Sequence, residues 1–348
     1  MATEPETIVP MHLRYFPRAL GVLLAACALA APTAGAQTHS TGSEPALSSS
    51  KGQAWPARPM RMIVTGVAGG PSDLAARLLS ERLSRALGQP MRVENRPGDE
   101  GVQAAAGAAG DGNTWLFAPS TALVIYPYIT DLVPYDPEDD FAGVAMVGTT
   151  PFVVVANPDL NVKSLSDLIA LAHEAPGRLA YASPGLRTLP GILGEMLRQR
   201  AALELMVVPY RSAQSVVDVI AGRTHIAVES VPAIATAVQR GQLRALAVSS
   251  AKRLPELKDV PTFAEAFPDI EFNAWYALVA PAATPGAVIQ RVNRELALLL
   301  ADPDVEQRLN LLGIYPEGAG APAQIDAFFE SERAFWRKTV RELKIEPD

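Results

Sequence analysis

The chain has 348 residues, a formal net charge of −7 and a sequence pI near 5.3. An acidic balance of this kind argues against a nucleic acid or an anionic membrane surface as the partner. After the first 54 residues roughly 290 remain, which is enough for two lobes of ordinary domain size.

Residues 1–36 are predicted to be an export signal. Two arginines precede an apolar run over residues 19–31, and the small residues 34–36 form a cleavage site. The acidic residues before Met11 are untypical of a signal, so Met11 is the alternative start. We expect a mature periplasmic protein that begins near Gln37. Its first segment, residues 37–54, is rich in Ser, Gly, Ala and Thr and is expected to be a flexible leader.

The only cysteine, Cys27, lies inside this signal, in a segment that is similar to a bacterial lipoprotein box. Lipidation of Cys27 is therefore the alternative to a cleaved, soluble form. The apolar run continues past Cys27 to a better peptidase site, which favours cleavage. In either case the mature domain has no disulfide.

The first strand and helix of the mature chain are joined by a glycine turn. Residues 62–64 form an apolar run suited to a buried strand, and apolar positions recur at helical spacing from Leu74 to Leu87. Between them, Gly69 and Gly70 leave main-chain N–H groups uncovered next to the first turn of the helix. Such a turn can hold a small carboxylate, although it can also be only a tight connection. It lacks the GxGxxG and phosphate-loop patterns, so we expect no nucleotide and no cofactor.

Four later strands end in the same way, at residues 118, 182, 208 and 228. Each is followed by hydroxyl, glycine, aromatic or charged residues and then by a helical pattern. These residues are Ser120, Thr121, Ser183, Gly185, Arg187, Thr188, Tyr210, Glu229 and Ser230.

The alternation of strands and helices predicts an α/β fold, with mainly parallel sheets flanked by helices. Ligands bind such sheets at the carboxyl ends of the strands. Because several short loops share this chemistry, the sequence predicts one cleft built from many loops, which is typical of a binding protein.

Motifs spread from Trp55 to the C-terminal half resemble the periplasmic solute-binding proteins of tripartite tricarboxylate transporters, the Bordetella uptake gene product (Bug) family. The matching segments are Trp55-Pro56 with Arg58-Pro59, Gly69-Gly70 with Asp73, Leu87-Gly88-Gln89-Pro90, Val93-Glu94-Asn95-Arg96-Pro97-Gly98, Tyr135-Asp136-Pro137 with Asp140-Phe141, Val208-Pro209-Tyr210, Leu243-Arg244-Ala245-Leu246-Ala247-Val248 and Asp259-Val260-Pro261-Thr262.

The resemblance implies a two-lobed, type II-like periplasmic binding protein with crossings near Ala156 and Phe272. Lobe 1 would comprise residues 55–155 and 276–348, and lobe 2 residues 156–275. The resemblance also implies a monomer that binds a small organic acid between the lobes and delivers it to the membrane permease subunits of a tripartite tricarboxylate transporter.

The resemblance assigns the binding loops to the turns described above. The first loop maps onto Val67, Ala68, Gly69, Gly70, Ser72 and Asp73, the second onto Ser120 and Thr121, the third onto 183–188, and the fourth onto Glu229 and Ser230. The chain departs from the family pattern at Gly66-Val67-Ala68, where an aromatic residue and a proline are usual, and at Leu186-Arg187. Arg187 is either a solvated loop residue or a partner for a second ligand carboxylate.

Ligand sensing and catalysis are the two alternatives to transport. A liganded form that reports to an extracytoplasmic sensor kinase would use the same surfaces, and the sequence does not separate it from a transport protein. An enzyme is disfavoured, since His173 and His225 stand apart from any catalytic pattern and no cluster has the spacing of metal ligands. We therefore expect no catalytic residues and no metal.

Overall fold

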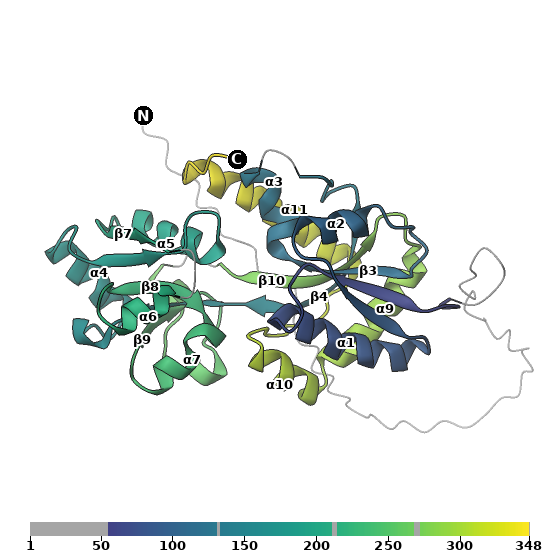
Figure 1. The fold of residues 1–348 in the computed structure, drawn as a ribbon, viewed down its shortest axis with the longest axis horizontal. Helices are drawn as coiled ribbons and strands as arrows, with labels where there is room; N and C mark the ends of the chain where they lie inside the picture. Colours follow the sequence, from purple (N-terminus) through teal and green to yellow (C-terminus); the bar gives the residue numbers. More distant parts are fainter. Residues whose placement is uncertain (1–54, 131–132, 211–213, 268–271, 348) are drawn as a thin grey trace, which may run out of the picture.

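The computed structural model describes residues 55–130, 133–210, 214–267 and 272–347, so the predicted signal and leader lie outside the described residues. The described chain folds into two lobes, each built on one five-stranded sheet flanked by helices (Figure 1). The strand orders are β2-β1-β3-β10-β4 in lobe 1 and β7-β6-β8-β5-β9 in lobe 2. The predicted two-lobed α/β fold is confirmed. The sheets are mixed and not mainly parallel, because each has two parallel and two antiparallel strand pairs, the antiparallel ones at the strands next to the crossings.

Lobe 1 contains both ends of the described chain. Its strands are β1 (Met60–Val64), β2 (Met91–Asn95), β3 (Thr114–Pro119), β4 (Phe141–Thr150) and β10 (Ala274–Pro281). Its helices are α1 (Pro71–Leu87), α2 (Asp99–Ala106), the π-helical η1 (Thr121–Ile125), α3 (Tyr126–Ile129), α9 (Gly286–Leu300), α10 (Pro303–Leu311) and α11 (Pro322–Glu342).

Lobe 2 is formed by the middle of the chain. Its strands are β5 (Phe152–Ala156), β6 (Ala180–Ser183), β7 (Met206–Pro209), β8 (Ile226–Ser230) and β9 (Arg244–Val248). Its helices are α4 (Leu165–Glu174), α5 (Leu189–Arg200), α6 (Gln214–Ile220), α7 (Val231–Gln239) and α8 (Phe263–Ala266), with short 3-10 turns η2 (Pro158–Leu160) and η3 (Pro255–Leu257).

The chain first crosses between the lobes at Pro151, between β4 and β5. All of β5 pairs with β8 and β9 in the second sheet, so the predicted boundary after residue 155 is wrong by one strand. The proline explains the break, because it has no N–H to donate to a continuous ladder. The chain returns to lobe 1 before Ala274, where β10 begins two residues before the predicted restart of lobe 1 at residue 276.

The strand register directs the two sets of candidate loops toward the junction between the lobes. In lobe 1 the carboxyl end of β3, at Pro119, pairs with Tyr276 near the start of β10, next to the crossing. In lobe 2 the carboxyl end of β8, at Ser230, pairs with Phe152, the first residue after the other crossing. Because β1 and β2 run parallel to β3, and β6 and β7 run parallel to β8, their carboxyl ends lie at the same two edges.

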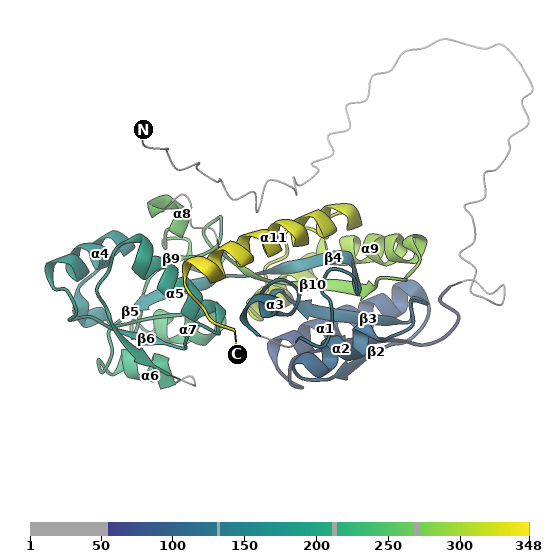
Figure 2. The same ribbon diagram turned by 90° about the horizontal axis from the view of Figure 1, so that it is seen from above.

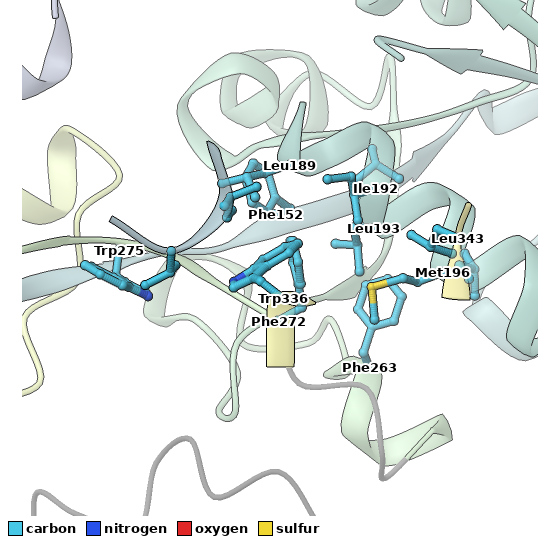
Figure 3. Packing of buried hydrophobic residues seen from close by; sticks show 14 of the residues in the cluster. Phe152, Leu189, Ile192, Leu193, Met196, Phe263, Phe272, Trp275, Trp336 and Leu343 are labelled. Atoms are coloured by element: carbon cyan, nitrogen blue, oxygen red, sulfur yellow. The ribbon is translucent and has the colours of Figure 1, made fainter. Parts of the chain in front are cut away.

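Helix α11 runs along lobe 1 toward lobe 2 (Figure 2). Its Trp336 contacts Phe272, with ring centroids 5.1 Å apart, in the segment that leads back to β10. Trp336 and Leu343, the residue directly after α11, belong to the same buried cluster as Leu189 and Met196 of lobe 2 (Figure 3). One apolar core is therefore continuous across the two lobes on this side of the molecule.

Candidate ligand pocket

A pocket of about 290 Å³ lies in lobe 1, where β1, β2 and β3 end. This volume is near the small end of ordinary ligand pockets, which are roughly 300–1,000 Å³. The residues that line it come from three strand ends and from β10; they are Thr65, Gly66, Ser72, Gly98, Asp99, Val102, Pro119, Thr121, Ala122, Tyr126 and Tyr276. The predicted site residues Ser72 and Thr121, from two separate turns, are brought together here.

The predicted β1–α1 turn is held in shape by Asp73. The main-chain N–H of Gly69 donates to Asp73 Oδ2 at 2.8 Å, which requires the left-handed conformation that Gly69 adopts at φ 81°. Arg77 contacts both carboxylate oxygens at 2.9 Å, and Asn95 Nδ2 donates to Oδ1 at 2.9 Å. The bonds from Arg77, chiefly, hold the pKa of Asp73 at about 2, against an opposing effect of burial.

These contacts correct the interpretation of the first loop. The Asp73 carboxylate takes the N–H of Gly69, and the N–H of Gly70 donates to the Val67 carbonyl at 3.1 Å, so neither glycine N–H points freely at a ligand. The Val67 side chain is 65% exposed, and Ala68 is also exposed. Asp73 therefore acts as an internal brace, and Ser72 is the residue of this loop that reaches the pocket.

Helix α1 presents its first turn to this pocket without a capping side chain. Its N-cap is Gly70, which has no side chain to accept from the turn, and Pro71 at the first position has no N–H. In a helix of 17 residues this turn carries the positive end of the dipole and the main-chain N–H groups that follow Pro71. The pocket thus has a donor-rich, positively polarised wall.

Tyr276 of β10 forms another wall of the pocket. Its ring stacks on Phe117 with centroids 5.0 Å apart, and a hydrogen bond joins its phenol to Ser72. Burial raises the pKa of Tyr276, and the bond to Ser72 only partly offsets that effect, so the phenol is a neutral hydrogen-bonding group. By contrast, Trp275 turns into the core, where it stacks on Phe329 and donates to Glu332.

Asp99, at the start of α2, brings a carboxylate to the pocket beside two phenols. Burial chiefly, and then the charge of Asp99, raise the pKa of both Tyr126 and Tyr135, and Asp99 and Tyr126 both line the pocket. Tyr126 also bonds to Thr121, and Tyr135 donates to the Ala122 carbonyl at 2.9 Å.

The predicted residues of lobe 2 are engaged with one another and do not line this pocket. Ser183 Oγ accepts from the Gly185 N–H at 3.2 Å, and Thr188 caps α5 by accepting from Gly191. Ser215 donates to Glu229 at 2.8 Å, and burial is the main effect that raises the pKa of Glu229.

Three more predicted residues lie at the start of a helix or are hydrogen-bonded to a neighbour. Ser230 is the N-cap of α7 and makes no capping bond through its side chain, whereas Ser120 Oγ accepts from the N–H of Trp275 at 3.4 Å. The Tyr210 phenol donates to Asp218 at 2.6 Å, and this bond is the main reason why the pKa of Tyr210 is raised.

Arg187 points across the junction to the main chain of lobe 1. Its guanidinium donates to the Ile129 carbonyl at 3.0 Å and to the Glu346 carbonyl at 3.2 Å. The structure thus differs from both interpretations of Arg187, since it joins the lobes instead of being only solvated or lining the pocket. The physical reason is that unpaired carbonyls at the end of α3 and in the C-terminal segment are strong acceptors for a cation.

The sequence patterns did not assign Asp99, Tyr126 or Tyr276 to the site. A usable signal was present, because Asp99 follows β2 just as Ser72 follows β1, and the carboxyl ends of parallel neighbours share an edge. His173 and His225 each bond to the main chain: His173 Nε2 bonds to the Ala201 carbonyl, and His225 Nδ1 accepts from the Ala180 N–H.

Within the described ranges, no group of three or more His, Cys, Asp and Glu residues is placed to hold a metal ion. No helix in this part of the chain has both the length and the apolar character that crossing a bilayer would require.

Comparison with known proteins gives consistent matches over most of the chain. Residues 75–344 match the family model described as "Tripartite tricarboxylate transporter family receptor". The chain is 36% identical over 294 residues to "Protein BugT" of Bordetella pertussis, covering 83% of this chain and 90% of that protein.

Two similar solved structures were described with small dicarboxylates. "R. palustris Rpa4515 with adipate" is 30% identical with a TM-score of 0.70, covering 84% of this chain and all of that one. "MatC (Rpa3494) from Rhodopseudomonas palustris with bound malate" is 26% identical with a TM-score of 0.65, covering 82% of this chain and 100% of that one. The family and the fold are those of binding proteins.

Proposed function

Because the chain belongs to the family of tripartite tricarboxylate transporter receptors, we propose that it is an extracytoplasmic solute-binding protein for a small metabolite that carries a carboxylate. It captures the ligand at the lobe 1 pocket, closes lobe 2 over it, and presents the closed form to the membrane subunits of a tripartite transporter. The predicted signal directs its export and is then cleaved, and the protein performs no catalysis.

The observation that carries this proposal is the polarity of the pocket. The uncapped first turn of α1 and the hydroxyl of Ser72 offer donors to an anion without a basic side chain. The loops after β6 and β8 lie at the edge of lobe 2 that faces the junction, so a closing movement brings them toward the ligand.

Calorimetric titration of the mature protein with adipate, malate, monocarboxylates and the matching neutral amides tests the proposal. At least one carboxylate should bind, and its amide should not. The variant Gly70→Val adds bulk at the N-cap of α1, where the added Cβ would lie 3.1 Å from the Val67 carbonyl oxygen. We expect it to bind about 10- to 100-fold more weakly, which corresponds to the loss of about one hydrogen bond to a charged group.

Gly286→Val, at the start of α9, is the matched control because a Cβ there meets no atom within 4 Å. It should bind as the wild type does. Amides that bind as tightly as their acids, or a folded Gly70→Val variant with unchanged affinity, would show that the first turn of α1 does not bind the ligand carboxylate. Loss of uptake of the same acid on deletion of the gene tests delivery to a transporter.

A further inference from the structure

The pocket lies across one edge of the lobe 1 sheet, between helices on its two faces. Side chains of α1 pack with Met62 and Val64, whereas Val102 of α2 packs with Ile63, whose side chain alternates to the other face. The helices accordingly cover opposite faces of the sheet (Figure 1). Ser72 and Asp99 therefore approach the pocket from opposite sides.

The two sides differ in charge. The α1 side carries the positive end of a helix dipole, the Ser72 hydroxyl and the Asp73 carboxylate, which is paired with Arg77 and does not line the pocket. The α2 side carries the Asp99 carboxylate, which does line it. Among the residues that line the pocket, Asp99 is the only one with a charged side chain; the others are hydroxyl-bearing, glycine or apolar. No lining side chain is a cation that would neutralise Asp99.

The position of the Asp99 carboxylate is supported by its neighbours. Its charge acts on the phenol of Tyr126, which lines the pocket, and on that of Tyr135. The next residue, Glu100, shares the first turn of α2 but is exposed. Asp99 and Glu100 can both stabilise the N-terminus of α2 through the helix dipole. Only Asp99 lines the pocket, so only Asp99 is placed to contact a ligand.

We infer that the pocket selects a ligand with a carboxylate at one end and an ammonium group at the other, and that Asp99 recognises the ammonium group. This inference rests on the proposed function and narrows its ligand class. A second carboxylate would meet Asp99 in a partly buried site, where like charges repel more strongly than in bulk water. An ammonium group would form a charge-assisted hydrogen bond with Asp99 and with the neighbouring hydroxyls.

Pairs of ligands with equal numbers of carbon atoms provide the test. Adipate and 6-aminohexanoate differ by the exchange of one terminal carboxylate for a CH2–NH3⁺ group, and succinate and 4-aminobutanoate form a shorter pair that differs in the same way. Affinities are measured by calorimetry on the mature wild type, on Asp99→Asn and on Glu100→Gln. Thermal unfolding of each variant verifies that it is folded, and Asp99→Ala provides a second variant at the same position.

We expect the wild type to bind the amino acid of a pair at least tenfold more tightly than the diacid. Asp99→Asn should lower that ratio by about 10- to 100-fold and should bind the diacid more tightly, because the repulsion is gone. Glu100→Gln should keep the wild-type ratio.

Two results would overturn the inference. If the wild type binds the diacids at least as tightly and Asp99→Asn leaves the ratio unchanged, Asp99 does not select the ligand, while the proposed function stands. If no carboxylate of either class binds to the wild type or to Asp99→Asn, the proposed function fails together with the inference.

Discussion

Replacing Asp73 with asparagine removes one negative charge from the brace of the β1–α1 turn. The side chain is 2% exposed and receives bonds from the Gly69 N–H, from Arg77 and from Asn95. Asparagine keeps the shape and one acceptor oxygen, but it loses the ion pair. The variant therefore tests whether the turn depends on charge, while adding little steric strain.

The size of the effect follows from the pKa of Asp73, which falls from 3.8 to about 2 on folding. A lowered pKa in the folded protein stabilises it above the unfolded pKa, and this contribution is lost as the pH falls from 3.8 through 2. At 1.36 kcal/mol per pKa unit, the ionised form contributes about 2 kcal/mol at pH 7 and about half of that at pH 3.

Urea unfolding at pH 7 and pH 3 measures this contribution. We expect Asp73→Asn to lower the free energy of unfolding by about 2 kcal/mol at pH 7, with the difference from the wild type shrinking at pH 3. Glu81→Gln is the control on the same helix, because its pair with Arg85 is exposed and is expected to contribute well under 1 kcal/mol. Equal stability of Asp73→Asn and the wild type at pH 7 would refute the reasoning.

Three further predictions concern the pocket, the junction and the N-terminus. Gly66→Ala places a Cβ 2.1 Å from Ser72 Oγ, so the hydroxyl has to move, and calorimetry should show a loss of carboxylate affinity of about tenfold; unchanged affinity would contradict the role of Ser72. Arg187→Ala removes a bridge to Ile129, so the Kd values of adipate and hexanoate should change by the same factor; a loss confined to adipate would show that Arg187 contacts the ligand. Mass spectrometry of the exported protein should give a chain that begins near Gln37, whereas a lipid on Cys27 would contradict cleavage there.

Local sequence patterns predicted the strand and helix order because each element has a strong local signal. The apolar run before Gly69, the recurring leucines of α1 and the glycine that ends that helix are all short-range features. The first lobe crossing was misplaced because β5 is an apolar run that suits a buried strand in either sheet. Only pairing with β8 and β9, far along the chain, assigns it to lobe 2.

The site was predicted less completely because its residues meet through topology. Ser72 and Thr121 followed from the repeated pattern of a strand followed by a hydroxyl. Tyr276 reaches them through a strand more than 150 residues beyond Thr121, and Asp99 through a turn whose chemistry resembles ordinary helix capping. The partners of Arg187 lie 58 and 159 residues away, so no local pattern indicates them.

The position of Trp336 gives the protein a built-in optical reporter. The chain has four tryptophans, and of these Trp275 and Trp336 belong to the apolar core shared by the two lobes, where Trp336 contacts Phe272. Trp55 and Trp115 pack against each other within the core of lobe 1, and Trp275 is stacked on Phe329. A change in the angle between the lobes would therefore alter the surroundings of Trp336, which contacts the segment that connects them, more than those of Trp55 and Trp115. Intrinsic fluorescence can follow closure on a ligand without any added label.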